Sequence, residues 1–70
     1  MNYKEARQQF AAKVSQLRRE KRMTQDELAE LIDKTTDYIS LLERGERSPS
    51  FEVIFALAEA LDVGSVSLLQ

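Results

Sequence analysis

Apolar residues recur every three or four positions along several stretches of the chain, which is the spacing of one face of an α-helix. Thr24 is followed three residues later by Glu27, as in a capping box, so a helix is predicted to begin near Gln25. The predicted helix over residues 3–21 carries the apolar stripe Ala6, Phe10, Val14 and Leu17, and the helix after Thr24 carries Leu28, Ala29 and Ile32.

The second half of the chain continues with helices and short breaks. After the break DKTT, Thr35 can cap a third helix that runs to about Arg44, and Gly45 stands where a helix end adopts a left-handed conformation. The segment ERSPS is a loop, because Pro49 cannot continue a helix and Ser50 can cap the next one. A fourth helix at about 51–61 and a short turn after Gly64 complete an all-α chain with no competing strand pattern.

The second and third predicted helices are joined by a turn of only three or four residues. This is the proportion of a helix-turn-helix unit, in which the second helix is presented to the major groove of DNA. Two helices this close must cross at a small residue, and Ala29 supplies one. An ordinary helical hairpin needs a similar contact, so the spacing alone leaves both structures open.

A helical wheel of residues 36–44 gives the third helix two different faces. Ile39 and Leu42 point to one side, with Tyr38 at the edge. The other side lacks the Glu–Lys pairs of a simple exposed helix and carries Thr36, Asp37, Ser40, Leu41 and Arg44. Such side chains can contact bases: leucine suits a thymine methyl group, and aspartate can accept from a cytosine amino group. The alternative for Asp37 is a purely local role in the first turn, against the helix dipole.

Composition excludes several classes of protein. Seventy residues make one small domain, and the absence of cysteine and histidine removes disulfides, thiolate metal sites and the commonest general base. Nothing in the sequence suggests an enzyme, a cofactor or a metal. No apolar run approaches the roughly 20 residues that span a bilayer, and the first ten residues are not a signal peptide. We therefore expect a soluble cytoplasmic protein with no membrane partner.

Charge is unevenly distributed along the chain. The net charge of −2 argues against nucleic acid, but residues 1–23 carry seven basic and two acidic side chains. A cationic stripe on an acidic body is one interpretation, and a solvated helix face is the other.

The motifs MTQDELAELI and YISLLERGERSPSFEVIFALAEALDV resemble those of the Cro-like (XRE-type) helix-turn-helix family of phage repressors and small bacterial regulators. The likeness covers about residues 14–69. It implies a compact five-helix bundle of the phage-repressor type, with the helix-turn-helix unit at about 25–44, that binds operator DNA as a homodimer. The YIS entry to the ERG segment is similar to controller proteins of restriction–modification systems.

The resemblance assigns roles to individual residues. Base-facing positions correspond to Thr36, Asp37, Tyr38, Ser40 and Leu41. Phosphate-binding positions correspond to Arg18, which also pairs with Glu43 in this pattern, and to Gln25, Lys34, Arg44, Arg47 and Ser48. Two residues depart from the family pattern: Asp33 replaces the usual glycine of the turn, and Lys34 replaces an apolar residue. Aspartate tolerates a left-handed conformation. Lys34 must keep its ammonium group in solvent, so the apolar contact between the two helices is smaller than usual at this position.

The C-terminal segment, about 62–70, is predicted to form the dimer interface. Its apolar side chains Val66, Leu68 and Leu69 are many for a short tail, although they can instead close the core of the monomer. A twofold dimer would place two recognition helices about 34 Å apart and select a palindromic operator. We expect no small-molecule ligand. The alternative function is a protein-binding module of the same fold, such as an antitoxin or an adaptor, which the overall acidity favours.

Overall fold

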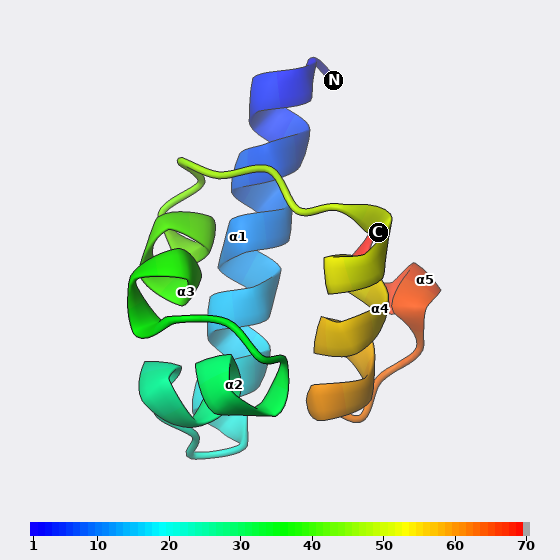
Figure 1. Ribbon diagram of the computed structural model, residues 1–70. Helices are drawn as coiled ribbons and strands as arrows, with labels where there is room; N and C mark the ends of the chain where they lie inside the picture. Colours follow the sequence, from blue (N-terminus) through cyan, green and yellow to red (C-terminus); the bar gives the residue numbers. More distant parts are fainter. Residues whose placement is uncertain (70) are drawn as a thin grey trace.

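Five helices account for most of the chain. The computed structural model describes residues 1–69, and no strand occurs among them. The helices are α1 (Tyr3–Glu20), α2 (Gln25–Leu31), α3 (Thr36–Glu43), α4 (Phe51–Ala60) and α5 (Ser65–Leu68). Helix α2 packs on α3, α1 contacts both α3 and α5, and α4 packs on α5 (Figure 1). The predicted all-α, five-helix fold is confirmed.

Four helices begin at a side chain that caps the first turn. The caps Asn2, Thr24, Thr35 and Ser50 have extended backbones, and each side-chain oxygen accepts the N–H group three residues later. At Thr24 the capping box is complete, because Glu27 Oε1 accepts the Thr24 N–H at 2.8 Å and Thr24 Oγ1 accepts the Glu27 N–H at 3.0 Å. These hydrogen bonds lower the pKa of Glu27. The capping prediction is confirmed for Thr24, Thr35 and Ser50, and Asn2 adds a cap that the sequence analysis did not name.

The same four helices end in one backbone motif. In each, the residue after the C-cap is left-handed, and its N–H and the next one bond back to the last turn, which is a Schellman motif. Gly45 occupies this position after α3 at a φ of 74°. Arg22, Asp33 and Asp62 occupy it after α1, α2 and α4, with φ between 56° and 58°. The predicted left-handed turn at Asp33 is confirmed.

A single apolar core joins all five helices. Its most deeply buried side chains are Val14, Leu28, Ile39, Leu42, Leu57, Leu61 and Leu68. Leu68 is only 1% exposed, so within one chain it belongs to the core, which is the alternative that the sequence left open. The short α5 directs Leu68 inward to close the core of the monomer, because a chain of this size has few other apolar groups with which to cover α1 and α4.

Lys34 is exposed, as its charge requires, and its Nζ atom lies 5.5 Å from the centre of the Tyr38 ring. Tyr38 is half-buried and packs against the core. The exposed Lys34 therefore lies next to a tyrosine that packs against the core.

Replacing Asp62 with glycine should raise the free energy of unfolding by about 0.5–1 kcal/mol. A left-handed backbone costs an L-residue roughly 1–2 kcal/mol, and the added freedom of the unfolded chain cancels part of the gain. Asp62 is exposed at a φ of 56°, so no packing is lost. Urea unfolding of parent and variant measures the change.

The reverse change, Gly45→Ala, is the matched control. A Cβ atom at this left-handed position would lie 3.2 Å from Gln8 Cγ, and the variant should lose about 1–2 kcal/mol. An Asp62→Gly variant less stable than the parent would contradict the account.

Candidate nucleic-acid interface

Helices α2 and α3 form a tight corner whose inner side is fully apolar. Ala29 is 2% exposed where the helices cross, next to Leu28, Ile39 and Leu42, which are fully buried. The turn is closed by the Lys34 N–H, which bonds to the Ala29 carbonyl at 2.9 Å. Since Ile39 and Leu42 hold one side of α3 against the core, the opposite side of α3 faces outward.

This outward side carries the predicted base-reading residues, with different exposure. Thr36 and Asp37 are exposed, whereas Tyr38, Ser40 and Leu41 are half-buried. The Thr36 hydroxyl donates to Asp26 Oδ1 of α2 at 2.8 Å. A hydroxyl has one donor and two acceptor positions, so Thr36 remains able to accept a hydrogen bond but has committed its proton. Asp26 was not among the predicted residues, because nothing in a spacing of ten residues signals this contact.

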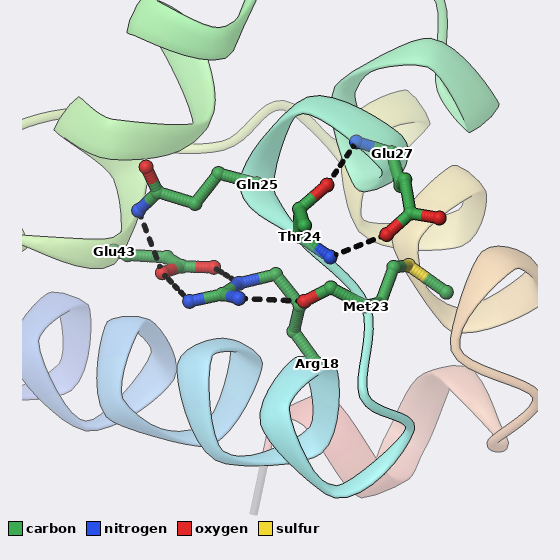
Figure 2. A network of polar contacts seen from close by, with 6 residues as sticks. All are labelled: Arg18, Met23, Thr24, Gln25, Glu27 and Glu43. Atoms are coloured by element: carbon green, nitrogen blue, oxygen red, sulfur yellow. Dashed lines mark hydrogen bonds and ion pairs between the residues drawn. The ribbon is translucent and has the colours of Figure 1, made fainter.

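A buried ion pair ties α3 to α1 (Figure 2). Arg18 donates from Nε to Glu43 Oε2 at 2.7 Å and from Nη2 to Glu43 Oε1 at 3.0 Å. Its Nη1 donates to the Met23 carbonyl at 2.7 Å, just before α2 begins. The side chains of Arg18 and Glu43 are 11% and 5% exposed. The paired arrangement of guanidinium and carboxylate fixes orientation as well as distance.

These contacts argue against Arg18 as a phosphate ligand. Each of its three nitrogen atoms already donates to the protein, and little of the guanidinium reaches the surface. The hydrogen bond to Glu43 raises the pKa of Arg18. Arg18 therefore holds α1, α3 and the start of α2 together, and the pairing with Glu43 that the resemblance implied is present.

Gln25 joins the same network at the first position of α2. Its Nε2 atom donates to Glu43 Oε1 at 3.0 Å (Figure 2). An amide nitrogen has two N–H groups, so one donor of the half-buried Gln25 remains for another acceptor. Burial by itself would raise the pKa of Glu43, but the hydrogen bonds from Arg18 and Gln25 and the Arg18 charge outweigh it and lower the pKa.

The structure brings three predicted residues together around one ring. The Arg47 guanidinium lies 5.1 Å from the centre of the Tyr38 ring, and Lys34 Nζ lies 5.5 Å from it. Cations within about 6 Å of an aromatic face are attracted to it. Burial raises the pKa of Tyr38, against a smaller opposing effect of Arg47. Lys34, Tyr38 and Arg47 therefore form a positively charged edge next to the outward side of α3.

The remaining two predicted phosphate ligands differ in availability. Arg44 has an exposed side chain whose Nε donates to the Ser40 carbonyl at 3.3 Å and lies 3.5 Å from Glu46 Oε2. Such an exposed ion pair is weak and can be exchanged for a phosphate. Ser48 is half-buried and its hydroxyl is hydrogen-bonded to the Tyr3 hydroxyl. Neither Tyr3 nor Glu46 was among the residues predicted from the sequence.

A second surface lies on α4 and α5. Phe51 and Phe55 are 76% and 60% exposed on α4, and Val66 and Leu69 are 63% and 60% exposed at α5. We call these four residues the α4–α5 surface. Val66 and Leu69 were predicted from the sequence and the two phenylalanines were not, although a helical wheel of 51–61 places both outside the apolar stripe. Gln70, the end of the predicted 62–70 segment, lies outside the described residues.

No helix within residues 1–69 is both long and apolar enough to span a membrane. The same residues hold no group of three side chains suited to a metal ion.

Several known proteins are similar to this chain in sequence and fold. A family model described as Helix-turn-helix matches residues 14–68. An uncharacterized HTH-type transcriptional regulator, y4dJ of Sinorhizobium fredii, is 42% identical over 55 residues, 79% of this chain and 71% of that protein. The structure of the restriction-modification controller protein C.AhdI from Aeromonas hydrophila is similar, with 31% identity and a TM-score of 0.90 over 97% of this chain and 99% of that one. The clp gene regulator ClgR from Corynebacterium glutamicum is similar over 91% of this chain and 68% of that one, with 31% identity and a TM-score of 0.88.

Replacing Glu43 with glutamine should lower the free energy of unfolding at neutral pH by about 3 kcal/mol, because it leaves the buried Arg18 charge without its partner. The lowered pKa of Glu43 means that its stabilisation is complete above the ordinary glutamate pKa of about 4.3 and is lost as pH falls through the folded-state value. The variant should therefore lose less stability than the parent on acidification. Urea unfolding as a function of pH measures the loss at neutral pH and the pH dependence. Equal pH dependence in the variant and the parent would contradict the role given to the Glu43 carboxylate.

Proposed function

The chain belongs to the XRE-type helix-turn-helix family, and on this premise we propose that it is a transcriptional regulator that reads duplex DNA with residues 36–44. The observation that carries the proposal is the outward side of α3. Ile39 and Leu42 hold the opposite side of α3 in the core. Glu43 ties the C-terminal end of α3 to α1 and α2. A helix held in this way can enter a major groove without rearrangement.

Base reading falls to the exposed and half-exposed side chains of α3. Leu41 can contact a thymine methyl group, and Asp37 can accept from a cytosine amino group. Thr36 acts as an acceptor, since its proton is held by Asp26. Ser40 lies within this set between Thr36 and Asp37, and Tyr38 lies at its edge, where it can meet sugar and phosphate.

Phosphate binding falls to the cations around α3. Lys34, Arg44 and Arg47 carry the charge, and Gln25 adds the free N–H of its side chain. This set omits Arg18 and Ser48, whose polar groups are engaged within the protein. If two subunits neutralise about six phosphates, log affinity should fall with log salt concentration with a slope of about −5.

The protein acts as a homodimer through the α4–α5 surface and the rest of the predicted segment 62–70, which contains α5. Four exposed apolar side chains lie on two adjoining helices, and a twofold interface would remove them from water. A dimer with recognition helices about 34 Å apart would bind a palindromic operator. The similarity to C.AhdI supports a controller-type regulator. Selection of bound sequences from random duplexes tests the proposal, and the absence of any enriched sequence would favour a protein-binding module instead.

Leu41→Ala should change which operator is preferred, at a cost of about 1–3 kcal/mol on the parent site. Arg44→Ala, at the end of the same helix, is the matched comparison. It should weaken binding to all sequences and reduce the salt slope by about one. Fluorescence anisotropy with the parent operator and with single-base variants separates the two patterns. A Leu41→Ala protein with the preference of the parent would remove Leu41 from the base-reading set.

The double variant Phe55→Ser/Val66→Ser should raise the dimer dissociation constant by at least about tenfold, because each lost apolar side chain contributes roughly 1.5–3 kcal/mol when buried. Gln16→Ser is the control, since Gln16 is exposed on α1 in a hollow lined only by other α1 residues and Glu43 of α3. Sedimentation equilibrium measures the constant. Equal dimerisation of the double variant and the control would place the interface elsewhere.

A further inference from the structure

The first two turns of α1 contact the segment that links α3 to α4. Figure 1 shows this segment crossing α1 near its N-terminal half. The Tyr3 hydroxyl is hydrogen-bonded to the Ser48 hydroxyl, although the residues are 45 positions apart. Gly45 lies so close to α1 that a Cβ atom there would be 3.2 Å from Gln8 Cγ. The two segments therefore touch at both ends of the crossing.

The position of Tyr3 is itself supported. The Arg7 guanidinium lies 5.7 Å from the centre of the Tyr3 ring, one turn along α1. A shallow cavity of about 200 Å³ separates the two segments and is lined by residues of both, including Tyr3, Arg7, Ser48 and Pro49. Tyr3 thus has a defined orientation toward the loop despite its exposure.

The loop has few other restraints. After Glu46, whose N–H bonds to the Leu41 carbonyl, no backbone–backbone hydrogen bond involving residues 47–49 is formed with any other described residue. Arg47 and Ser48 are instead held by side-chain contacts, Arg47 against Tyr38 and Ser48 against Tyr3. Loss of either contact would leave a loop that must be ordered again on binding, and ordering one residue costs roughly 1–2 kcal/mol.

We propose that Tyr3, acting through Ser48, is a positioning residue that holds Arg47 ready for a DNA phosphate. The inference rests on the proposed function. It makes the beginning of α1, which precedes the residues 14–68 that match the family model, part of the DNA-binding device. Ser48 is then the link between Tyr3 and Arg47 rather than a phosphate ligand. These contacts strengthen binding by preorganisation, because the loop is already ordered in the free protein and loses less conformational entropy when it binds DNA.

The test is a pair of double-mutant cycles measured as affinity for the selected operator. Tyr3→Phe and Ser48→Ala should each weaken binding about three- to tenfold, and together no more than either alone. In an Arg47→Ala background, Tyr3→Phe should cost less than about twofold, since the group that it positions is gone. A general loss of stability would not depend on Arg47 in this way.

Gln16→Ala, an exposed change two turns further along α1, is the control and should bind as the parent does. Thermal unfolding confirms that each variant is folded at the assay temperature. Equal losses for Tyr3→Phe with and without Arg47, or no loss at all, would overturn the inference while leaving the proposed function intact. A parent protein that binds no duplex would overturn both.

Discussion

The ion pair between Arg18 and Glu43 is the contact on which the arrangement of the other elements depends. It joins the last turn of α1 to the last residue of α3, and it reaches α2 through Gln25 and the Met23 carbonyl. A buried pair of this kind gains little over an apolar contact of the same size, but either partner alone would be costly. Its contribution is therefore orientation: only one placement of α3 against α1 and α2 satisfies all of these hydrogen bonds.

The small size of the domain explains why polar contacts have this role. Seventy residues bury a modest apolar core, which fixes the inner sides of the helices but leaves the rotation and tilt of short ones weakly determined. Three side-chain hydrogen bonds add restraints at specific points. The start of α3 is held by Thr36 with Asp26, its end by Glu43 with Gln25, and the following segment by Ser48 with Tyr3. The outward side of α3 is in this way rigid at both ends.

Specific side-chain contacts also place the positive charges of the chain. The chain is acidic overall, yet the cations Lys34 and Arg47 meet at the Tyr38 ring beside α3, and Arg44 stands at the end of that helix. The basic N-terminal segment contributes Arg18 to the interior and Arg7 to the support of Tyr3. A net charge computed from the sequence therefore says little about the potential at the proposed interface, which is set by a few side chains on one edge.

The sequence by itself determined the features that depend on neighbours within a few residues. The caps Thr24, Thr35 and Ser50, the left-handed Asp33 and Gly45, the apolar stripes and the family motifs were all readable, because capping and helical periodicity act over one or two turns. Tertiary structure decided the rest. It turned Leu68 into the core, withdrew Arg18 from the surface, and paired Thr36 with Asp26 and Tyr3 with Ser48. These outcomes depend on which distant segment covers each side chain, and local spacing carries no information about that.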